Sequence, residues 1–297
     1  MSLHVGAVFP TTEIGSDPVA VRDWAQAAES LGYEHLIIYD HVLGAVHADR
    51  QPPLMGPYTE KDPFHEPLVT LGYLAGVTER IGLTTGVVIL PQRQTALVAK
   101  QAAQVDLLSG GRLRLGVGSG WNWVEYEALG IPFAGRGKRL DEQVELMRAL
   151  WEGEVIDYRG DQHRIDRANL LPRPTAPIPI WFGAMSDVAV KRAARVGDGV
   201  LYGTKPSRLK RIHAVLLEAL EEIGRDPQQV GAEAVLDFAD GPDDWHREIE
   251  IWRELGGTHL SIRAMDTGAE MMGIERRGYS GLSDYVDALE TFKKETR

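Results

Sequence analysis

Cysteine is absent from this sequence of 297 residues, which excludes disulfide bonds, thiolate catalysis and cysteine-ligated metals. Positive charge is also scarce: 32 lysines and arginines stand against 43 aspartates and glutamates, giving a net charge of −11. That balance argues against nucleic acid or an anionic membrane as the main partner. No apolar run approaches the roughly 20 residues needed to span a bilayer. We therefore expect neither nucleic acid nor a membrane among the partners.

The amino terminus enters a strand directly. Residues 3–9 (LHVGAVF) have no basic region or cleavage site before them, so we expect a cytoplasmic protein. The composition, 43% hydrophobic and 25% charged, is that of a globular chain of enzyme size. The length suits one large α/β barrel or two smaller domains.

Helices and short apolar strands alternate along the chain. Asp17 can cap the first helix, Pro18 fits its first turn, Trp24 lies on its apolar stripe, and Gly32 ends it. Further helices are predicted near residues 66–78, 95–108, 140–151, 186–197, 206–223, 243–255 and 282–296. Strands are predicted at 3–9, 36–38, 81–88, 113–117, 178–182, 199–202, 234–238 and 259–262.

About eight strands separated by helices require parallel pairing with right-handed crossovers. The count and length predict an α/β fold, a (β/α)8 TIM barrel that spans residues 1–297 as a single domain. A glycine-rich turn after the fourth strand, not the first, argues against a dinucleotide-binding sheet. Insertions are expected after strand 2 (residues 42–65) and before strand 5 (residues 154–177). The first is rich in proline and glycine, and we interpret it as a lid.

Ionisable side chains follow the first two strands, and the chemistry of a barrel lies at the carboxyl ends of its strands. Glu13 comes after the first strand, and the adjacent pair Asp40 and His41 after the second. Histidine can donate to a carbonyl or carry a proton near neutral pH. We take His41, Asp40 and Glu13 as catalytic candidates. The alternative is that Asp40 caps a loop and His41 is a satisfied core group.

Two later strands end in residues suited to binding through the backbone. The fourth gives residues 116–121 (GVGSGW), where glycine lets backbone amides approach a bound group closely. The fifth leads into residues 183–186 (GAMS), which open a helix whose free amides could bind a phosphate. The alternatives are a tight turn that binds nothing and an ordinary serine cap.

Other chemistries have little support. The HxH start of metal-binding barrels is missing and His4 stands alone, so no metal is expected. Lys205 is the one candidate for a Schiff base, and nothing else supports that reaction. Arg136, Lys138 and Arg139 precede the predicted helix at 140 and either bind an outside anion or form a solvated turn. The remaining residues at the strand ends are mostly apolar or glycine, which suits a flat organic cofactor that itself carries out the chemistry.

At this point the chain resembles the luciferase-like monooxygenase superfamily, and within it the group that uses the deazaflavin coenzyme F420. The similarity covers nearly the whole length. It rests on six segments in this order and spacing: Asp40-His41, 85–91 (TGVVILP), 108–113 (LSGGRL), 116–121 (GVGSGW), 128–133 (ALGIPF) and 193–199 (AARVGDG). Together they are specific for the superfamily and less specific for the cofactor.

The resemblance implies a barrel that binds the ring system of the cofactor at the carboxyl ends of its strands. It also implies a homodimer. A non-prolyl cis peptide would fall at Val87–Val88 and support the ring, with His41 beside it. The cofactor-binding residues implied along the third and fourth strand ends are Val87, Val88, Leu90, Gly118, Ser119, Gly120 and Trp121. Those implied for the phosphate are Gly183, Ala184, Met185 and Ser186.

The chain departs from the F420-dependent glucose-6-phosphate dehydrogenases of this group. They place a glutamate proton donor after the fourth-strand glycines, where this chain has Trp121. They also carry an aromatic residue shortly after the histidine, where this chain has Ala45. Sugar-phosphate oxidation is therefore not expected, and Trp121 with Trp123 favours an apolar, flat or extended substrate. Glu13 or Glu125 would have to serve as the acid.

The resulting hypothesis is an oxidoreductase that transfers a hydride between F420 and a small organic substrate. An FMN-dependent monooxygenase of the same superfamily is the alternative within the enzymes. A non-catalytic flavin-binding barrel is the alternative from a different class.

Overall fold

The first βα unit shows how the sequence sets the local structure. The computed structural model describes residues 2–296. β1 (His4–Val8) leads to α1 (Pro18–Ser30), where the Asp17 side chain accepts a hydrogen bond from the Val19 amide at 2.9 Å. Gly32 follows the helix with a φ of +79°, a conformation that side chains disfavour. The capping residue and the glycine stop therefore act as the sequence predicts.

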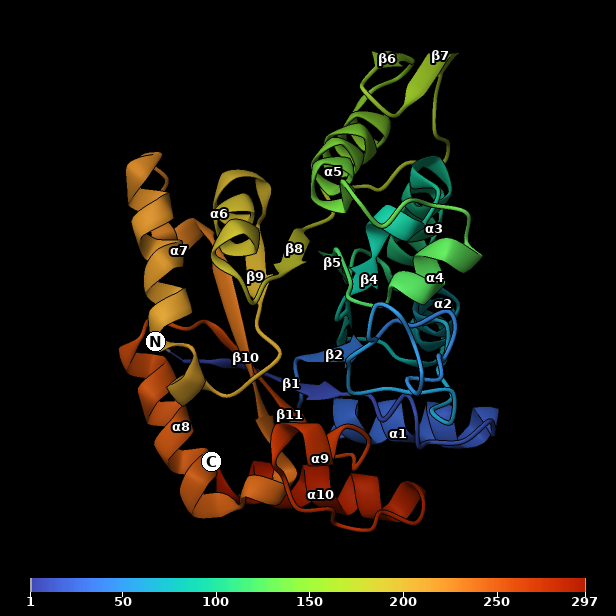
Figure 1. Cartoon of the computed structure of the whole chain (residues 1–297). Helices are drawn as coiled ribbons and strands as arrows, with labels where there is room; N and C mark the ends of the chain where they lie inside the picture. Colours follow the sequence, from blue (N-terminus) through green and yellow to red (C-terminus); the bar gives the residue numbers. More distant parts are fainter. Residues whose placement is uncertain (1, 297) are drawn as a thin grey trace.

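The strands form one closed parallel barrel, and Figure 1 shows the helices arranged around it. Around the barrel they are β3 (Gly82–Thr85), β2 (His35–Ile38), β1, β11 (His259–Arg263), β10 (Gly231–Asp237), β9 (Gly199–Leu201), β8 (Ile180–Gly183), β5 (Leu113–Gly118) and β4 (Val88–Ile89). β3 also pairs with β5, so the sheet has no free edge. Because β3 and β4 share one strand position, eight positions remain, and the predicted (β/α)8 barrel is confirmed.

The helices follow the predicted pattern with small differences at their ends. The main ones are α2 (Pro67–Val77), α3 (Thr95–Ser109), α5 (Arg136–Glu152), α6 (Asp187–Val196), α7 (Lys210–Glu222), α8 (Pro242–Glu254) and α10 (Leu282–Glu295). Shorter ones are α4 (Trp123–Ala128), α9 (Ala269–Met272) and the 3-10 turns η1 (Leu90–Gln92), η2 (Pro206–Arg208), η3 (Pro227–Gln229) and η4 (Phe238–Asp240).

The prediction for the start of α5 is wrong. The helix begins at Arg136, directly after Gly135 in the left-handed conformation, so Arg136, Lys138 and Arg139 belong to the helix. Arg136 lies over the Phe133 ring, 3.8 Å from its centre, and Arg139 donates to the Pro132 carbonyl. The two arginines therefore have partners within the protein, and an outside anion is not needed to explain them.

Both expected insertions are present (Figure 1). Between β2 and α2 the chain contains no helix or strand, and this segment includes residues 42–65, called the 42–65 loop below. Between α5 and β8, β6 (Ile156–Arg159) and β7 (Arg164–Ala168) pair as an antiparallel hairpin. The hairpin projects from the barrel beyond the end of α5.

Apolar side chains fill both sides of the barrel wall. Along β2, Leu36 and Ile38 face the surrounding helices, whereas Ile37 faces the interior, as a side-chain period of two requires. The interior cluster consists of Val8, Ile37, Trp181 and Leu201, with Tyr39, Val87 and Val235 packed against it. Val87 and Tyr39 thus connect the interior of the barrel to the carboxyl ends of its strands.

A buried carboxylate occupies the interior nearer the amino ends of the strands. Glu233 is fully buried and accepts hydrogen bonds from His35 Nε2 and Arg114 Nη2, both at 2.6 Å, and from the Ser261 hydroxyl at 2.5 Å. Burial raises the pKa of Glu233, but His35 and Arg114 outweigh it and hold the pKa well below its usual range. Removing Glu233 would leave the Arg114 guanidinium without its ion-pair partner.

The glycine in the middle of β5 is a strict requirement of barrel closure. A Cβ added at Gly116 would overlap the Thr85 carbonyl oxygen and lie 2.7 Å from Leu201 Cδ1. We expect Gly116→Ala to lower the free energy of unfolding by about 3 kcal/mol or more, or to prevent folding. In the control Gly72→Ala on α2, nothing lies within 4 Å of the new Cβ. That change should raise stability by roughly 0.5–1 kcal/mol. Urea denaturation measures both, and equal stabilities would contradict the closure argument.

Candidate functional site

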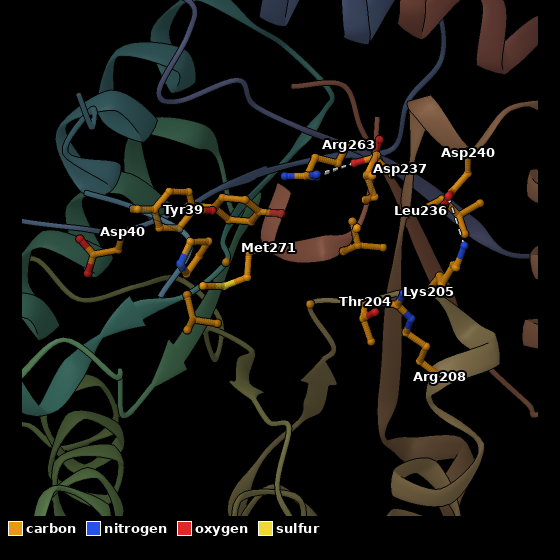
Figure 2. Close-up of a pocket in the computed structure, with 18 of the residues that line it drawn as sticks. Tyr39, Asp40, Thr204, Lys205, Arg208, Leu236, Asp237, Asp240, Arg263 and Met271 are labelled. Atoms are coloured by element: carbon orange, nitrogen blue, oxygen red, sulfur yellow. Dashed lines mark hydrogen bonds and ion pairs between the residues drawn. The ribbon is translucent and has the colours of Figure 1, made fainter. Parts of the chain in front are cut away.

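A cavity of about 390 Å³ opens at the carboxyl ends of the strands (Figure 2). Its apolar and aromatic wall contains Tyr39, Tyr58, Val87, Ile89, Val235, Leu236, Met271 and Ile274. Its polar lining comes from His41 after β2, from Thr204, Lys205 and Arg208 after β9, from Asp237 at the end of β10 and Asp240 after it, and from Arg263 at the end of β11. The volume is within the range of about 300–1,000 Å³ typical of small-molecule sites.

The strand interruption between β3 and β4 forms one wall of this cavity. The peptide bond Gly86–Val87 is cis, so the expected cis bond is present one residue earlier than Val87–Val88. Gly86, Val87 and Ile89 line the cavity, whereas Val88 and Leu90 are fully buried among the residues facing the helices. Because alternate residues of a strand face opposite sides, the side chains of Val88 and Leu90, both predicted to bind the cofactor, face away from this cavity.

The glycines of β5 and β8 make room for the side chain of Val87. A Cβ added at Gly118 would lie 2.5 Å from Val87 Cγ2, and one added at Gly183 would lie 3.0 Å from the same atom. Neither glycine lines the cavity. Their missing side chains serve the packing of Val87, and Val87 in turn forms part of the cavity wall.

The residues predicted to hold a phosphate lie outside the cavity. Ala184 is buried and donates its amide to the Leu201 carbonyl at 3.2 Å, while Met185 is 56% exposed. Ser186 caps α6 by accepting from the Ala189 amide at 3.4 Å. The ordinary capping interpretation thus accounts for Ser186 without a ligand.

The residues after β5 pack under the 42–65 loop. Ser119 accepts a hydrogen bond from the Tyr126 hydroxyl at 2.8 Å, and Gly120, with a φ of +61°, packs on Ile89. Trp121 lies against the His41 ring at 5.3 Å between ring centres and directly against Gly56 of the loop. None of the three lines the cavity, so Trp121 packs against the His41 ring from outside the cavity.

His41 is oriented by a buried carboxylate that comes from α4. Glu125 Oε1 lies 3.2 Å from His41 Nδ1 and accepts hydrogen bonds from the Val42 and Leu43 amides at 2.7 and 2.9 Å. Burial raises the pKa of Glu125, but His41 and the two amides outweigh it, so the pKa lies below its usual value. Because a carboxylate only accepts hydrogen bonds, Nδ1 of neutral His41 must carry the proton. Nε2 then has a free lone pair on a ring that lines the cavity.

Asp40 lies at the edge of the cavity with both carboxylate oxygens engaged. Oδ1 accepts from Arg93 at 2.7 Å and Oδ2 from the Ile89 amide at 2.9 Å. Burial raises the pKa of Asp40, and Arg93 opposes this rise. Asp40 thereby fixes β4 to the end of β2, and each of its carboxylate oxygens already accepts a hydrogen bond from the protein.

Glu13, predicted as a catalytic residue, does not line the cavity. Its carboxylate accepts hydrogen bonds from the amide and hydroxyl of Thr267, from the Asp266 amide at 3.1 Å and from the Tyr285 hydroxyl at 3.2 Å. These bonds hold the segment after β11 against the first βα connection. These contacts are those of a residue that stabilises the connection between the two segments.

Several cavity residues escape the sequence analysis, above all the pair Asp237 and Arg263. Their strands are neighbours, and the two residues are paired in register across them. Arg263 Nε donates to Asp237 Oδ2 at 2.8 Å, and Nη2 lies 2.6 Å from the same oxygen without the alignment of a hydrogen bond. Tyr39, beside them in the cavity, has a pKa raised to about 12 by burial. An aspartate and an arginine ending adjacent barrel strands are the signal that could have identified the pair.

Neither a metal site nor a transmembrane helix is found in residues 2–296. No group of three or more histidine, aspartate or glutamate side chains there could hold a metal ion. No helix in this part of the chain is both long and apolar enough to cross a bilayer.

Comparison with known proteins identifies the family. The family model described as "Luciferase-like monooxygenase" matches residues 2–285. The chain belongs to this family. A luciferase-like relative from Mycobacterium tuberculosis, described only as an uncharacterised protein, is 38% identical over 206 residues, which is 68% of this chain and 71% of the relative.

Two better characterised proteins are more distant from this luciferase-like chain. An F420-dependent glucose-6-phosphate dehydrogenase from Segniliparus rotundus is 30% identical over 254 residues, 82% of this chain and 72% of that protein. The solved structure of an F420-dependent secondary alcohol dehydrogenase, with an F420-acetone adduct, superimposes with a TM-score of 0.78 at 18% identity and covers 100% of both chains. The second comparison shows the shared fold.

The contacts of Glu125 predict a pH-dependent contribution to stability. We expect Glu125→Gln to lower the free energy of unfolding by about 1–2 kcal/mol at neutral pH, because the amide keeps fewer of its hydrogen bonds. The folded-state pKa lies below the usual 4.5, so the contribution is present above that pH and is lost as the pH falls through the folded-state pKa. Urea denaturation at a series of pH values measures this. Glu127→Gln, exposed on the same helix, is the control. A difference that does not change with pH would refute the argument.

Proposed function

We propose that this luciferase-like protein is an oxidoreductase that transfers a hydride between coenzyme F420 and a small organic substrate. The observation that carries the proposal is the orientation of His41, which Glu125 holds on the wall of the cavity beside Val87. The family membership and the F420-dependent relatives support the choice of reaction and cofactor.

The cavity lining fits a flat organic ring. Val87, Ile89 and Leu236 offer apolar surface, and Gly203 lines the cavity with nothing within 4 Å of an added Cβ. A ring can therefore approach the backbone there closely. When bound, F420 supplies the carbon that gives or receives the hydride.

The residues around the proposed ring site orient the substrate and transfer a proton to or from it. His41 Nε2 can accept a proton from a substrate hydroxyl, and protonated His41 can donate one to a carbonyl oxygen. Tyr58 and Phe64 of the 42–65 loop pack edge-on against His41, with ring centres 5.2 and 4.8 Å away. The loop thereby shields this side of the site from water and acts as a lid.

Binding of the cofactor tests the proposal at its first step. We expect F420 to bind with a dissociation constant well below that of FMN and to quench tryptophan fluorescence, since Trp121 lies against His41. Parallel titrations of F420 and FMN measure this. Tight FMN binding with no response to F420 would favour the monooxygenase alternative. Reduced F420 is then mixed with a panel of ketones, aldehydes and conjugated enones, and recovery of the oxidised absorbance reports turnover. Tight F420 binding without turnover of any of them would favour a binding protein.

A cavity-filling substitution tests where the cofactor binds. We expect Gly203→Leu to weaken F420 binding at least tenfold, because the new side chain occupies the cavity without a backbone clash. The thermal midpoint should change by only a few degrees. Gly72→Leu on α2, where nothing lies within 4 Å of the new Cβ, is the matched control and should bind F420 like the wild type. Unchanged F420 binding in Gly203→Leu would place the cofactor elsewhere.

A further inference from the structure

We propose that the substrate is an organic anion whose negative group pairs with Arg208, at the end of the cavity formed by the segment after β9. This inference rests on the proposed function, since it names the substrate class of the same site. It replaces the expectation of a purely apolar substrate. That expectation depended on Trp121 and Trp123, and neither residue lines the cavity.

The carboxylates that line the cavity are already engaged by protein donors. Asp40 binds Arg93 and the Ile89 amide, and Asp237 binds Arg263 through one oxygen and the Ala239 amide at 2.9 Å through the other. Asp240 pairs with Lys205 at 3.1 Å. A cationic ligand would have to displace one of these buried or half-buried pairs.

Hydrogen-bond donors, in contrast, are left over. The hydroxyls of Tyr39, Tyr58 and Thr204 have no hydrogen-bond partner in the described part of the chain, and neither does the guanidinium of Arg208. Arg263 Nη2 is also unaligned with any acceptor. The hydroxyls can donate or accept, whereas the Arg208 guanidinium can only donate. A ligand group that pairs with Arg208 must therefore bring acceptors, and carboxylate and phosphate groups are the richest in acceptor oxygens.

The charges of the cavity lining also favour a negatively charged ligand. Lys205 is balanced by Asp240, Asp244 is paired with Arg247 at 2.6 Å, and Arg263 is balanced by Asp237. Asp40 is balanced by Arg93. Arg208 therefore carries the one positive charge without an ion pair among the cavity residues that the structure describes. One bound anion would neutralise it.

The positions of these groups define the shape of the substrate. Figure 2 shows Arg208 beside Thr204 and near Lys205, on the opposite side of the cavity from Tyr39 and Asp40. His41, which follows Asp40, lies on that far side. A substrate that reaches both must carry its anionic group at one end and its reacting carbon at the other, with an apolar middle against Leu236 and Ile274. Carboxylic acids with a remote carbonyl or hydroxyl have this form.

F420 itself carries a phosphate and carboxylates on its side chain, so the anion at Arg208 has two possible sources. The deazaflavin chromophore without this side chain separates them. If Arg208 binds the side chain, Arg208→Gln weakens the binding of F420 but not of the chromophore, and the proposal is overturned. If Arg208 binds the substrate, both cofactor forms keep their wild-type affinity.

The direct experiment compares benzoate with benzamide, which have similar shapes and differ in charge. Each is titrated by calorimetry into the protein alone and into the protein saturated with F420, so failure of cofactor binding does not hide the result. We expect the wild type to prefer benzoate, and Arg208→Gln to weaken benzoate roughly three- to tenfold without affecting benzamide. Lys210→Gln removes the same charge from a nearby exposed position outside the cavity and should change nothing.

Three outcomes would overturn the proposal. They are no measurable benzoate binding, no preference for benzoate over benzamide, and a preference that survives in Arg208→Gln. An equal loss in Lys210→Gln would show a general effect of net charge and would also overturn it.

Discussion

The packing of the Val87 side chain is the constraint on which the site depends. Its side chain occupies the space that Gly118 and Gly183 leave open, and it packs against the apolar cluster inside the barrel. The interior is thereby closed beneath the cavity, and a dry apolar wall faces the ring site. Any larger residue at either glycine would push Val87 toward the ligand. The glycine-rich segment that looks like a ligand cradle in the sequence is thus primarily a packing device.

Paired charges arrange the polar part of the site around this wall. Glu125 orders the start of the 42–65 loop and fixes the proton on His41 Nδ1, while Asp40 and Arg93 tie β4 to the end of β2. Asp237 and Arg263 join the last two strands. Each of these carboxylates is already hydrogen-bonded within the protein. The unpaired hydrogen-bond donors of the cavity and the unbalanced charge of Arg208 therefore determine which ligands the cavity binds. The fold and the selectivity of the site follow from the same pairs.

The fold was predictable because its signals are local. Capping residues, glycine stops and the alternation of helix and strand identify most elements, and the number of strands predicts the barrel. The site was predictable only in part. The sequence identifies His41 and Val87 at the strand ends, and both line the cavity. Side chains alternate between the two faces of a strand, so Val88 and Leu90 face the helices. That alternation can be assigned only when the strand boundary is known. Arg263 and Asp237 are 26 residues apart in sequence and meet only through the register of β10 and β11.

A structure of the protein with F420 bound tests the account most directly. The account predicts the deazaflavin ring in the cavity between His41 and Gly203, in contact with Val87, and the Arg208 guanidinium free of the cofactor side chain. A ring bound against Trp121 and Ser186 instead, with the cavity beside Val87 left open, would contradict it.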